Sequence, residues 1–426
     1  MLDIKFIRDN KELVSEAARK KHIKFDVDEL LEVDKKRIEL LQIVEGKRAE
    51  QNKASEEIVR VTDSIAKEKI KKDMKILKEQ VSGSEELLKS ITTQWQTLML
   101  HVPNIPDISV PEGESDADNQ EIKVWGDKTK FDFEPKDHVE LMLDLGLADF
   151  ERGTKVHGFR GYFLTGDAVK LTLAIWSYAH DFWAEKGFVP VIAPIVVNRN
   201  TFIANGYLPQ GEEDLFKTQD GQFLAGTAEV PLMGMFEGEV LEGLENNPLK
   251  YLGFSPCYRR EAGAHSKDTK GLIRVHEFYK WEQVVLCEAN HETSVKLHDE
   301  INRNTEEFIE SLEIPYHTVV NCAGDLGQGQ VKKYDIELWV PKEGKYREIS
   351  SASYFHDFQT RRGNIKYKGA DGVSRFAHSL NCTAIPTPRI LVSLIENYQN
   401  KDGSITIPKA LQKYMNGQEK IIKKTA

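Results

Sequence analysis

Charged and aromatic side chains alternate with apolar ones along a short stretch in the second half of the chain. The stretch reads LIRVHEFYKWEQ from residue 272, and a strand period of two would put its polar positions on one face. These positions are Arg274, His276, Phe278, Lys280 and Glu282. A guanidinium suits a phosphate, a ring suits a base and a carboxylate suits an ammonium group. The pattern indicates a site for a nucleotide and an amino acid, although a solvated sheet face can show the same alternation.

A second polar segment precedes this one. The sequence from Cys257 to Gly263 would place Arg259 and Glu261 on a common strand face. The polar run GAHSKDTKG, residues 263–271, follows and is long enough to close over a ligand. We therefore expect strands near 251–261 and 272–287 joined by a functional loop.

Several other kinds of site are excluded. The chain has no GxxxxGK[ST] and no GxGxxG, so neither a P-loop nor a dinucleotide fold is indicated. Its four cysteines form no CxxC pair, and we expect reduced, mostly buried thiols. The net charge of −10 argues against indiscriminate coating of nucleic acid. With no apolar run of about 18 residues and charges at the start, we expect a cytoplasmic protein without membrane segments.

The N-terminal quarter has heptad patterning. Apolar residues recur at spacings of three and four in two segments without proline, 30–65 and 70–98, with Arg37, Lys47, Gln51 and Ser84 as breaks. Two segments of similar length favour an antiparallel helical hairpin with arms of roughly 45–60 Å. We expect its turn near residues 66–70.

A cluster of lysines lies beside the expected turn. It comprises Lys67, Lys69, Lys71, Lys72, Lys75 and Lys78. A solvated face that serves solubility explains such a cluster, but a long hairpin without a core of its own also suits a role in reaching a distant partner.

The rest of the chain divides at a proline-containing segment. Residues 101–130 read as a linker between an N-terminal domain, 1–100, and a second domain, 131–426. In the second domain we expect helices at 168–186 and 389–399. Strands are expected at 188–197, 334–340 and 346–353, the first at an edge or bulge because it contains two prolines. Without strict βαβ alternation, an antiparallel sheet flanked by helices is favoured.

Three segments resemble the motifs of class II aminoacyl-tRNA synthetases. Residues 187–194 resemble the end of motif 1, 254–283 resemble motif 2, and 381–399 resemble motif 3. More narrowly, the helical arm and four short runs resemble seryl-tRNA synthetases. These runs are Pro103–Pro106, Thr227–Glu229, Arg347–Ser351 and Asp357–Arg362.

The resemblance implies an α+β fold, with an N-terminal coiled-coil hairpin and a class II catalytic domain built on an antiparallel β-sheet. It implies a serine–tRNA ligase that activates L-serine with ATP and Mg²⁺ to seryl-adenylate and passes the seryl group to the 3′ end of tRNA(Ser). A cytoplasmic homodimer is implied as well, and tRNA(Sec) is an open second partner.

The resemblance also assigns roles to residues. Arg259 and Arg389 would be catalytic, and the lysine cluster would bind tRNA. The serine-binding positions would be Thr227, Ala228, Glu229, Arg259, Glu282 and Thr383. The ATP-binding positions would be Arg259, Arg260, Glu261, Phe278, Glu348, Ile349, Ser350, Ser351 and Arg389. Glu348 and Ser351 would hold the metal; because they are three residues apart, a bulge or turn is needed near Ser350.

The sequence departs from the common family pattern between Cys382 and Pro388, where a glycine- and serine-rich run is more usual, and at Arg260, where a small residue is. Two alternatives stay open. One is a relative that loads a small amino acid onto a carrier protein, which would have no use for the arm. The other is a paralogue that binds tRNA without catalysis, against which the joint presence of Arg259, Phe278, Glu282, Glu348 and Arg389 argues.

Overall fold

The computed structural model describes residues 1–264 and 268–423. The chain forms two compact units, Met1–Pro103 and Asn104–Ala426. The three loop residues between Ala264 and Asp268 lie outside the described residues, so the expectation that this loop closes over a ligand stays a prediction.

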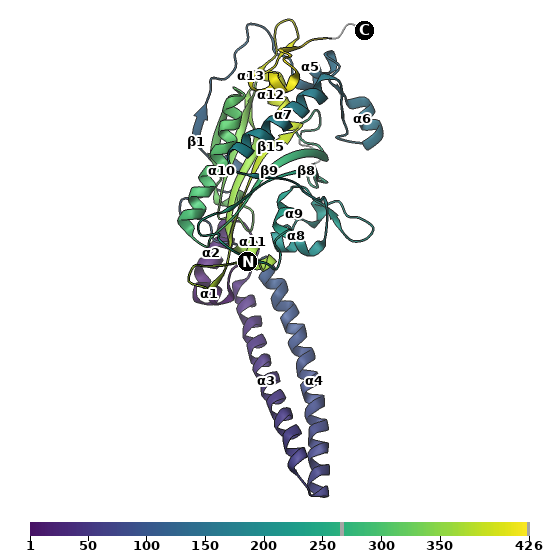
Figure 1. Cartoon of the computed structure of the whole chain (residues 1–426), viewed down its shortest axis with the longest axis vertical. Coiled ribbons are helices and arrows are strands. Elements are labelled where there is room, and N and C mark those ends of the chain that lie inside the picture. Colours follow the sequence, from purple (N-terminus) through teal and green to yellow (C-terminus); the bar gives the residue numbers. More distant parts are fainter. Residues whose placement is uncertain (265–267, 424–426) are drawn as a thin grey trace. The chain divides into compact units, whose positions relative to one another are not determined.

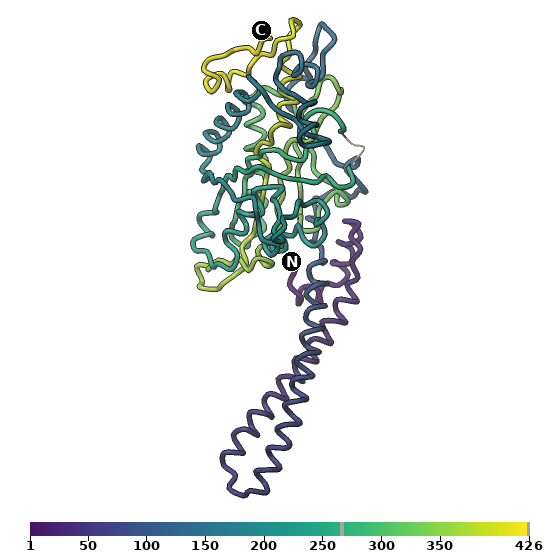
Figure 2. The backbone as a smooth tube through the Cα atoms, turned by 90° about the vertical axis from the view of Figure 1, so that its right-hand side faces the viewer, coloured from purple at the N-terminus to yellow at the C-terminus, as the bar shows by residue number. Residues whose placement is uncertain are grey.

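The first unit is helical. Two short helices, α1 (Ile4–Asp9) and α2 (Lys11–Lys20), precede two long ones, α3 (Val27–Arg60) and α4 (Ser64–His101). Figures 1 and 2 show α3 and α4 side by side and antiparallel. The predicted hairpin is confirmed.

Polar breaks in the heptad pattern make contacts across the hairpin, one with an aromatic ring of the opposite helix and one with another break. The Arg37 guanidinium lies 4.5 Å from the centre of the Trp95 ring, and Lys47 Nζ donates to Ser84 Oγ at 3.0 Å. These contacts join residues that a hydrophobic seam alone would leave unmatched, and they help to set the register of the two helices.

The turn of the hairpin is not at residues 66–70, so that prediction is wrong. Helix α3 ends at Arg60, and Val61 is already extended. The Asp63 carboxylate accepts from the N–H groups of Ile65 and Ala66 and caps α4. An N-cap aspartate therefore defines the turn without Gly or Pro, and the lysine cluster begins one turn of helix beyond it.

The second unit is built on an eight-stranded sheet. Its strand order is β1 (Gln120–Trp125), β10 (Tyr316–Val320), β11 (Lys332–Val340), β12 (Lys345–His356), β15 (His378–Thr387), β9 (Glu277–Cys287), β8 (Leu249–Tyr258) and β4 (Val189–Ile192). All neighbours are antiparallel except β4 and β8. The predicted antiparallel sheet is confirmed, with one parallel pair at its edge.

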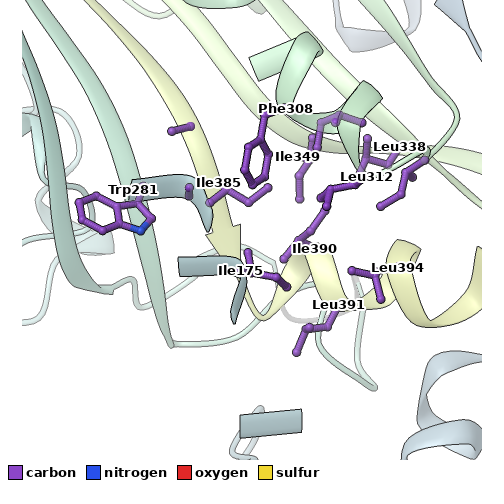
Figure 3. Packing of buried hydrophobic residues seen from close by; sticks show 14 of the residues in the cluster. Ile175, Trp281, Phe308, Leu312, Leu338, Ile349, Ile385, Ile390, Leu391 and Leu394 are labelled. Carbon is purple, nitrogen blue, oxygen red and sulfur yellow. The ribbon is translucent and has the colours of Figure 1, made fainter. Parts of the chain in front are cut away.

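Three helices supply most of the packing against the sheet: α7 (Asp167–Glu185), α10 (His291–Ser311) and α12 (Arg389–Asn397). Figure 3 shows Ile175, Phe308 and Ile390 from these helices meeting Trp281 and Ile385 from the strands. Odd-numbered residues of β9, such as Trp281 and Val285, join this core. Even-numbered residues, including Phe278 and Glu282, therefore face the other side.

Shorter elements complete the second unit. The helices are α5 (His138–Asp144), α6 (Phe150–His157), α8 (Arg199–Asn205), α9 (Glu229–Gly234), α11 (Phe358–Gly363) and α13 (Lys409–Gln412). The strands are β2 (Ala148–Asp149), β3 (Phe163–Leu164), β5 (Val196–Val197), β6 (Phe223–Leu224), β7 (Val240–Leu241), β13 (Lys366–Lys368), β14 (Ser374–Phe376), β16 (Ile405–Thr406) and β17 (Lys420–Ile421).

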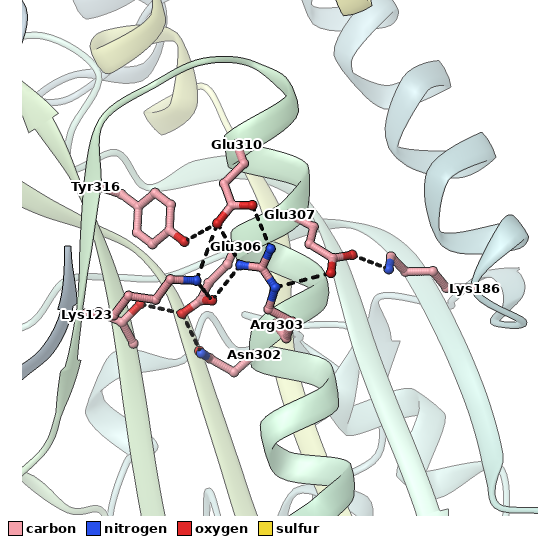
Figure 4. A network of polar contacts seen from close by, with 9 residues as sticks. Lys123, Lys186, Asn302, Arg303, Glu306, Glu307, Glu310 and Tyr316 are labelled. Carbon is pink, nitrogen blue, oxygen red and sulfur yellow. Dashed lines mark hydrogen bonds and ion pairs between the residues drawn. The ribbon is translucent and has the colours of Figure 1, made fainter. Parts of the chain in front are cut away.

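The segment predicted as a linker, 101–130, is partly integrated into the second unit. Asn104 is buried and donates through Nδ2 to the Phe355 carbonyl at 2.7 Å. Strand β1 supplies Lys123, whose Nζ pairs with Glu306 of α10 at 2.5 Å (Figure 4). The extended, proline-containing sequence predicts a linker, but backbone pairing and this ion-pair network make part of it an edge of the sheet.

Three strand boundaries also differ from expectation. The segment 188–197 is two strands, β4 and β5, and its expected edge position is confirmed. Strand β8 ends at Tyr258 and β9 starts at Glu277. The described residues 259–264 and 268–276 are therefore outside the strands, and the single face proposed for Arg274 through Glu282 holds only from Phe278 onward.

Two other expectations concern single features. All four cysteines are free and buried, as predicted. Among the described residues, no helix combines the length and the apolar character needed to cross a membrane.

Candidate active site

Two arginines that are 130 positions apart in the sequence line one pocket. Arg259 follows the end of β8, and Arg389 is the first residue of α12. The pocket is lined by Arg259, Glu261, Leu272, Ile273, Val275, Phe278, Lys280, Glu348, Ile349, Thr383, Pro386, Thr387, Pro388 and Arg389. The structure thus brings together residues from the segments that resemble motifs 2 and 3 and from the Arg347–Ser351 run, and none from the segment that resembles motif 1.

Arg389 is held by backbone carbonyls at the start of α12. Its Nε donates to Ile273 O at 2.9 Å, and one terminal NH₂ group donates to Glu348 O at 3.1 Å. Burial lowers the pKa of Arg389, and repulsion from Arg259 and Arg274 adds to this effect, opposed by Glu348. A guanidinium whose charge is disfavoured in this way is stabilised by an incoming anion.

Arg259 is fixed next to an aromatic ring. Its guanidinium donates to Gly226 O at 3.3 Å and lies 5.2 Å from the centre of the Phe278 ring. Its backbone N–H donates to His276 O at 3.0 Å, which extends the β8–β9 pairing beyond the strands. Among the described residues, no carboxylate forms an ion pair with this guanidinium. Its charge is therefore free for a ligand.

Glu348 and Ser351 share a face of the sheet because β12 contains a bulge. Ser351 is opposite Asp335 on β11, and Glu348 is opposite Glu337, with the register shifting between them. Asp335 and Glu337 are two residues apart and share a face, so their partners do as well. The predicted bulge near Ser350 is confirmed, and Ile349 is the extra residue.

Ser350 does not turn its side chain into the pocket. Its hydroxyl donates to Thr383 O at 2.5 Å and lies 3.4 Å from Cys382 Sγ, both on β15. Ser350 is 1% exposed. Only its backbone is available to a nucleotide, so a side-chain contact from this residue is not supported.

A second group of polar side chains is buried deeper, between β9 and β15. Thr383 is directly opposite Glu282. Glu282, 1% exposed, forms an ion pair with Lys280, and Thr383 Oγ1 donates to Glu282 Oε2 at 3.4 Å. Lys280 Nζ also donates to Thr383 Oγ1 at 3.3 Å. The carboxylate, ammonium and hydroxyl groups thus form a buried polar cluster, of which Lys280 and Thr383 line the pocket and Glu282 does not.

Glu229 lies beside this group at the start of α9. Gly253, the cross-strand partner of Glu282, lets this segment approach, since a Cβ there would lie 2.8 Å from Ala228 Cβ. The Glu229 carboxylate accepts from Gln359, Asn381 and Tyr207 at 2.6, 2.6 and 3.0 Å. Burial, and next the charge of Glu282, raise the pKa of Glu229 to about 7.

The other two residues of the Thr227–Glu229 run are also buried. Thr227 and Ala228 are 1% and 0% exposed, and Thr227 Oγ1 accepts from the Glu229 N–H at 3.2 Å. The hydroxyl thus holds the start of α9 in place. Thr227, Ala228 and Glu229 are therefore held inside the packed second unit and do not lie in an exposed loop.

Arg260 and Glu261 are in the turn after β8 rather than on the strand, so the prediction that Arg259 and Glu261 share a strand face is wrong. Glu261 has a φ of +54° and pairs with Arg274. Arg260 is exposed and does not line the pocket, although its N–H donates to Asp214 O at 2.9 Å. The turn leaves Glu261 in the pocket and directs Arg260 away from it.

A larger cavity, of about 560 Å³, lies next to this pocket and shares Thr387 and Pro388 with it. Its walls come mainly from α6, β3 and α7 and are mostly apolar or aromatic, with Arg160 and Glu277 among the charged exceptions. The smaller pocket has the two arginines and three carboxylate- or ammonium-bearing residues, so it is the stronger candidate for chemistry.

Sequence reasoning missed part of the pocket wall. Leu272, Ile273, Val275 and Pro386 line it although none has a reactive side chain. Lys280 falls on the predicted polar face, but the sequence assigns it no role. The partners of Glu229 had no signal at all, because Tyr207, Gln359 and Asn381 are dispersed over the sequence.

Two family models match the chain. The model for the tRNA synthetase class II core domain (G, H, P, S and T) covers residues 216–398, and the model for the seryl-tRNA synthetase N-terminal domain covers residues 1–106. With the sheet and the arginine pocket, these matches define a class II aminoacyl-tRNA synthetase.

Full-length relatives identify the family within this class. The chain is 43% identical to a serine–tRNA ligase of Deinococcus radiodurans, over 98% of both chains. It is 41% identical to one of Thermodesulfovibrio yellowstonii, over 97% of this chain and 99% of that one. The chain belongs to the seryl-tRNA synthetase family.

A solved structure supports the same family assignment. The crystal structure of seryl-tRNA synthetase from Pyrococcus horikoshii complexed with ATP matches with a TM-score of 0.91 and 38% identity, over 100% of both chains. The resemblance and the fold class expected from the sequence are therefore confirmed.

Proposed function

We propose that this chain is an ATP-dependent serine–tRNA ligase, which forms seryl-adenylate and transfers the seryl group to the 3′ end of tRNA(Ser). The observation that carries the proposal is the joint placement of Arg259 and Arg389 in one pocket, whose wall also includes Phe278 and Thr383, the cross-strand partner of the buried Glu282. The match to full-length serine–tRNA ligases supports the same reading.

The first step brings two anions together. An oxygen of the serine carboxylate forms a bond to the α-phosphorus of ATP, and the bond from that phosphorus to the bridging oxygen breaks, so that pyrophosphate leaves with the electron pair. Such a step needs fixed positive charge more than a general base. Arg259 is assigned to the α-phosphate and the serine carboxylate, and Arg389 to the distal phosphates. Phe278 would stack on the base, with Glu261 at its edge.

Serine would be recognised by the buried polar group. Glu282 would accept a hydrogen bond from the serine hydroxyl, and Thr383 would accept one from it or donate one to it. Glu229 would face the ammonium group of serine. A pocket of this kind penalises alanine, because its buried partners would then be unpaired. Thr227 and Ala228 would contribute backbone contacts on the same side.

Glu348 and Ser351 fit a magnesium ion bound together with phosphates. They present a carboxylate and a hydroxyl on one face, and Mg²⁺ prefers such hard oxygen ligands and commonly takes few from the protein. No group of three His, Cys, Asp or Glu side chains suited to a metal occurs among the described residues, which agrees with a metal that the nucleotide helps to hold. When bound, Mg²⁺ would neutralise phosphate charge. Ile349 and Ser350 would offer only backbone contacts.

The helical hairpin is assigned to tRNA binding. All six lysines of the cluster are exposed on α4, and only Lys71 has a nearby carboxylate, Glu68 at 3.6 Å, among the ion pairs of the described residues. Exposed lysines suit a phosphate backbone. We also propose tRNA(Sec) as a second substrate and a cytoplasmic location. We further propose a homodimer, whose interface would use the exposed apolar residues Val189 and Ile192 on edge strand β4.

Pyrophosphate exchange into ATP tests the proposed activation. Exchange is measured with each of the twenty amino acids in turn, and we expect serine alone to support it. Exchange with another small amino acid would favour the carrier-loading alternative. No exchange, with tRNA binding retained, would favour the paralogue without catalysis, and either outcome contradicts the proposal.

Deletion of residues 35–95 tests the role of the arm. Because the catalytic pocket lies entirely in the second unit, we expect exchange within about threefold of the intact chain, while charging of tRNA(Ser) falls about 100-fold or more as the phosphate contacts are lost. Equal loss of both activities would contradict separate roles. Charging of purified tRNA(Ser) and tRNA(Sec) in parallel separates the two proposed tRNA partners.

A further inference from the structure

A buried histidine outside the pocket connects two parts of its wall. His138 is the first residue of α5 and is 6% exposed. It lies between Glu396 on α12 and Leu272, where the chain returns from the loop toward β9. None of the roles assigned above uses it.

The hydrogen bonds around His138 define which ring nitrogen has the hydrogen. Glu396 is 0% exposed, and its Oε1 accepts from His138 N at 2.9 Å and lies 3.0 Å from His138 Nδ1. Its Oε2 accepts from Lys342 N at 3.1 Å. A carboxylate has only acceptors, so Nδ1 donates to it. Nε2 then accepts from Leu272 N, at 3.2 Å.

The bond to Leu272 acts on the wall of the nucleotide pocket. Leu272, Ile273 and Val275 line that pocket, and the Ile273 carbonyl accepts from Arg389 Nε at 2.9 Å. Arg389 is the first residue of α12, and Glu396 lies two turns later in the same helix. Helix α12 therefore holds this wall at two points, directly through Arg389 and indirectly through His138.

The backbone beside Leu272 is shaped to admit the imidazole. Gly271 has a φ of +78°, and a Cβ atom at this position would lie 2.1 Å from His138 Nε2. Any residue other than glycine would displace the ring. Gly271 thus permits the close approach of the imidazole, and its neighbour Leu272 donates the hydrogen bond to it.

We propose that His138 is a positioning residue for nucleotide binding, whose imidazole connects the Glu396 carboxylate to the Leu272 N–H and thereby fixes the pocket wall from Leu272 to Val275. The proposal rests on the proposed function in one respect, that ATP is the ligand of this pocket. His138 does not line the pocket and acts only through Leu272.

Two substitutions separate the two ends of the imidazole. His138→Asn places an amide N–H near the position of Nδ1, so it keeps the bond to Glu396 and loses the acceptor for Leu272. His138→Gln reaches the position of Nε2, so it keeps an acceptor for Leu272 and loses the bond to Glu396. The Glu396 carboxylate is the more costly group to leave short of a donor, because it is charged and fully buried.

The measurements are the dissociation constant for ATP with Mg²⁺, by calorimetry without serine, and the midpoint of thermal unfolding. We expect His138→Asn to weaken ATP binding about tenfold and His138→Gln to weaken it less than threefold, while His138→Gln has the lower midpoint. Deuterium uptake in residues 268–275 should rise in His138→Asn only. This opposite ranking of affinity and stability is not expected of a merely structural residue.

Equal losses of ATP affinity in the two variants, or none in His138→Asn, would overturn the proposal. If only one variant folds, the histidine ¹⁵N resonances of the unmodified protein test the proposal. The His138 signal is assigned as the one that is absent from the spectrum of that variant. The proposal requires that this ring has its proton on Nδ1, and a proton on Nε2 overturns it. An unmodified protein that does not bind ATP would instead contradict the proposed function, so the two failures are distinguishable.

Discussion

The two sides of the pocket handle charge in opposite ways. On the side assigned to the nucleotide, Arg259 has no ion-pair partner among the described residues, and Arg389 is 3.9 Å from the nearest carboxylate oxygen, that of Glu348. On the side assigned to serine, Glu282 and Glu229 do not themselves line the pocket and are nearly inaccessible to solvent, and each has at least two donors. The nucleotide side is incomplete without an anion, whereas the serine side is already formed.

This difference follows from what each ligand brings. ATP has several negative charges and can displace water from arginines that are partly open to solvent. Serine offers one hydroxyl and one ammonium group, too few contacts to rearrange a site, so its partners must be fixed beforehand by the sheet and α9. Substitutions on the two sides should therefore have different kinetic signatures.

The largest effect is expected from Arg259→Ala. Removing the only cation assigned to the α-phosphate should lower kcat/KM for serine-dependent exchange about 10³-fold, mainly through kcat. Arg260→Ala is the matched control, since this neighbouring arginine is exposed and outside the pocket, and it should cost less than threefold. Comparable losses in both variants would break the assignment of Arg259.

A smaller and differently distributed effect is expected from Glu282→Gln. It leaves Lys280 without its buried partner and weakens the partner for the serine hydroxyl, so kcat/KM for serine should fall about 30- to 100-fold. Binding of ATP alone should change less than threefold. Glu277→Gln, on the opposite face of the same strand, is the control. An equal loss of ATP affinity in Glu282→Gln would show that the two sides are not separate.

The smallest effect concerns pH. Burial, and next the charge of Glu282, raise the pKa of Glu229 to about 7, so the carboxylate is mostly neutral at pH 6 and mostly charged at pH 8. Only the charged form attracts the ammonium group of serine. The KM for serine should therefore fall about tenfold between pH 6 and pH 8, and Glu229→Gln should remove this dependence. A Glu229→Gln profile with the same slope would refute the role.

The sequence predicts those parts of this account that depend on local periodicity. The heptads indicate the hairpin, the period of two places Phe278, Lys280 and Glu282 on one face, and the spacing of Glu348 and Ser351 requires the bulge that β12 has. It fails where a few local contacts decide the geometry. One N-cap, that of Asp63, sets the hairpin turn, and the turn after β8 removes Arg260 from the pocket.

Contacts between distant residues are the other part that the sequence does not reveal. The donors to Glu229 come from positions 207, 359 and 381, and the bond of Arg389 to Ile273 spans 116 positions. Each depends on the order of strands in the sheet and not on any local pattern. The resemblance could name the residues but not the hydrogen bonds that orient them.

The most direct test of the central claim is a crystal structure of this protein with ATP and Mg²⁺. We expect the guanidinium groups of Arg259 and Arg389 to donate to oxygens of the same triphosphate at about 2.7–2.9 Å, with the adenine ring against Phe278. A nucleotide bound elsewhere, or one that contacts only one of the two arginines, would contradict the account.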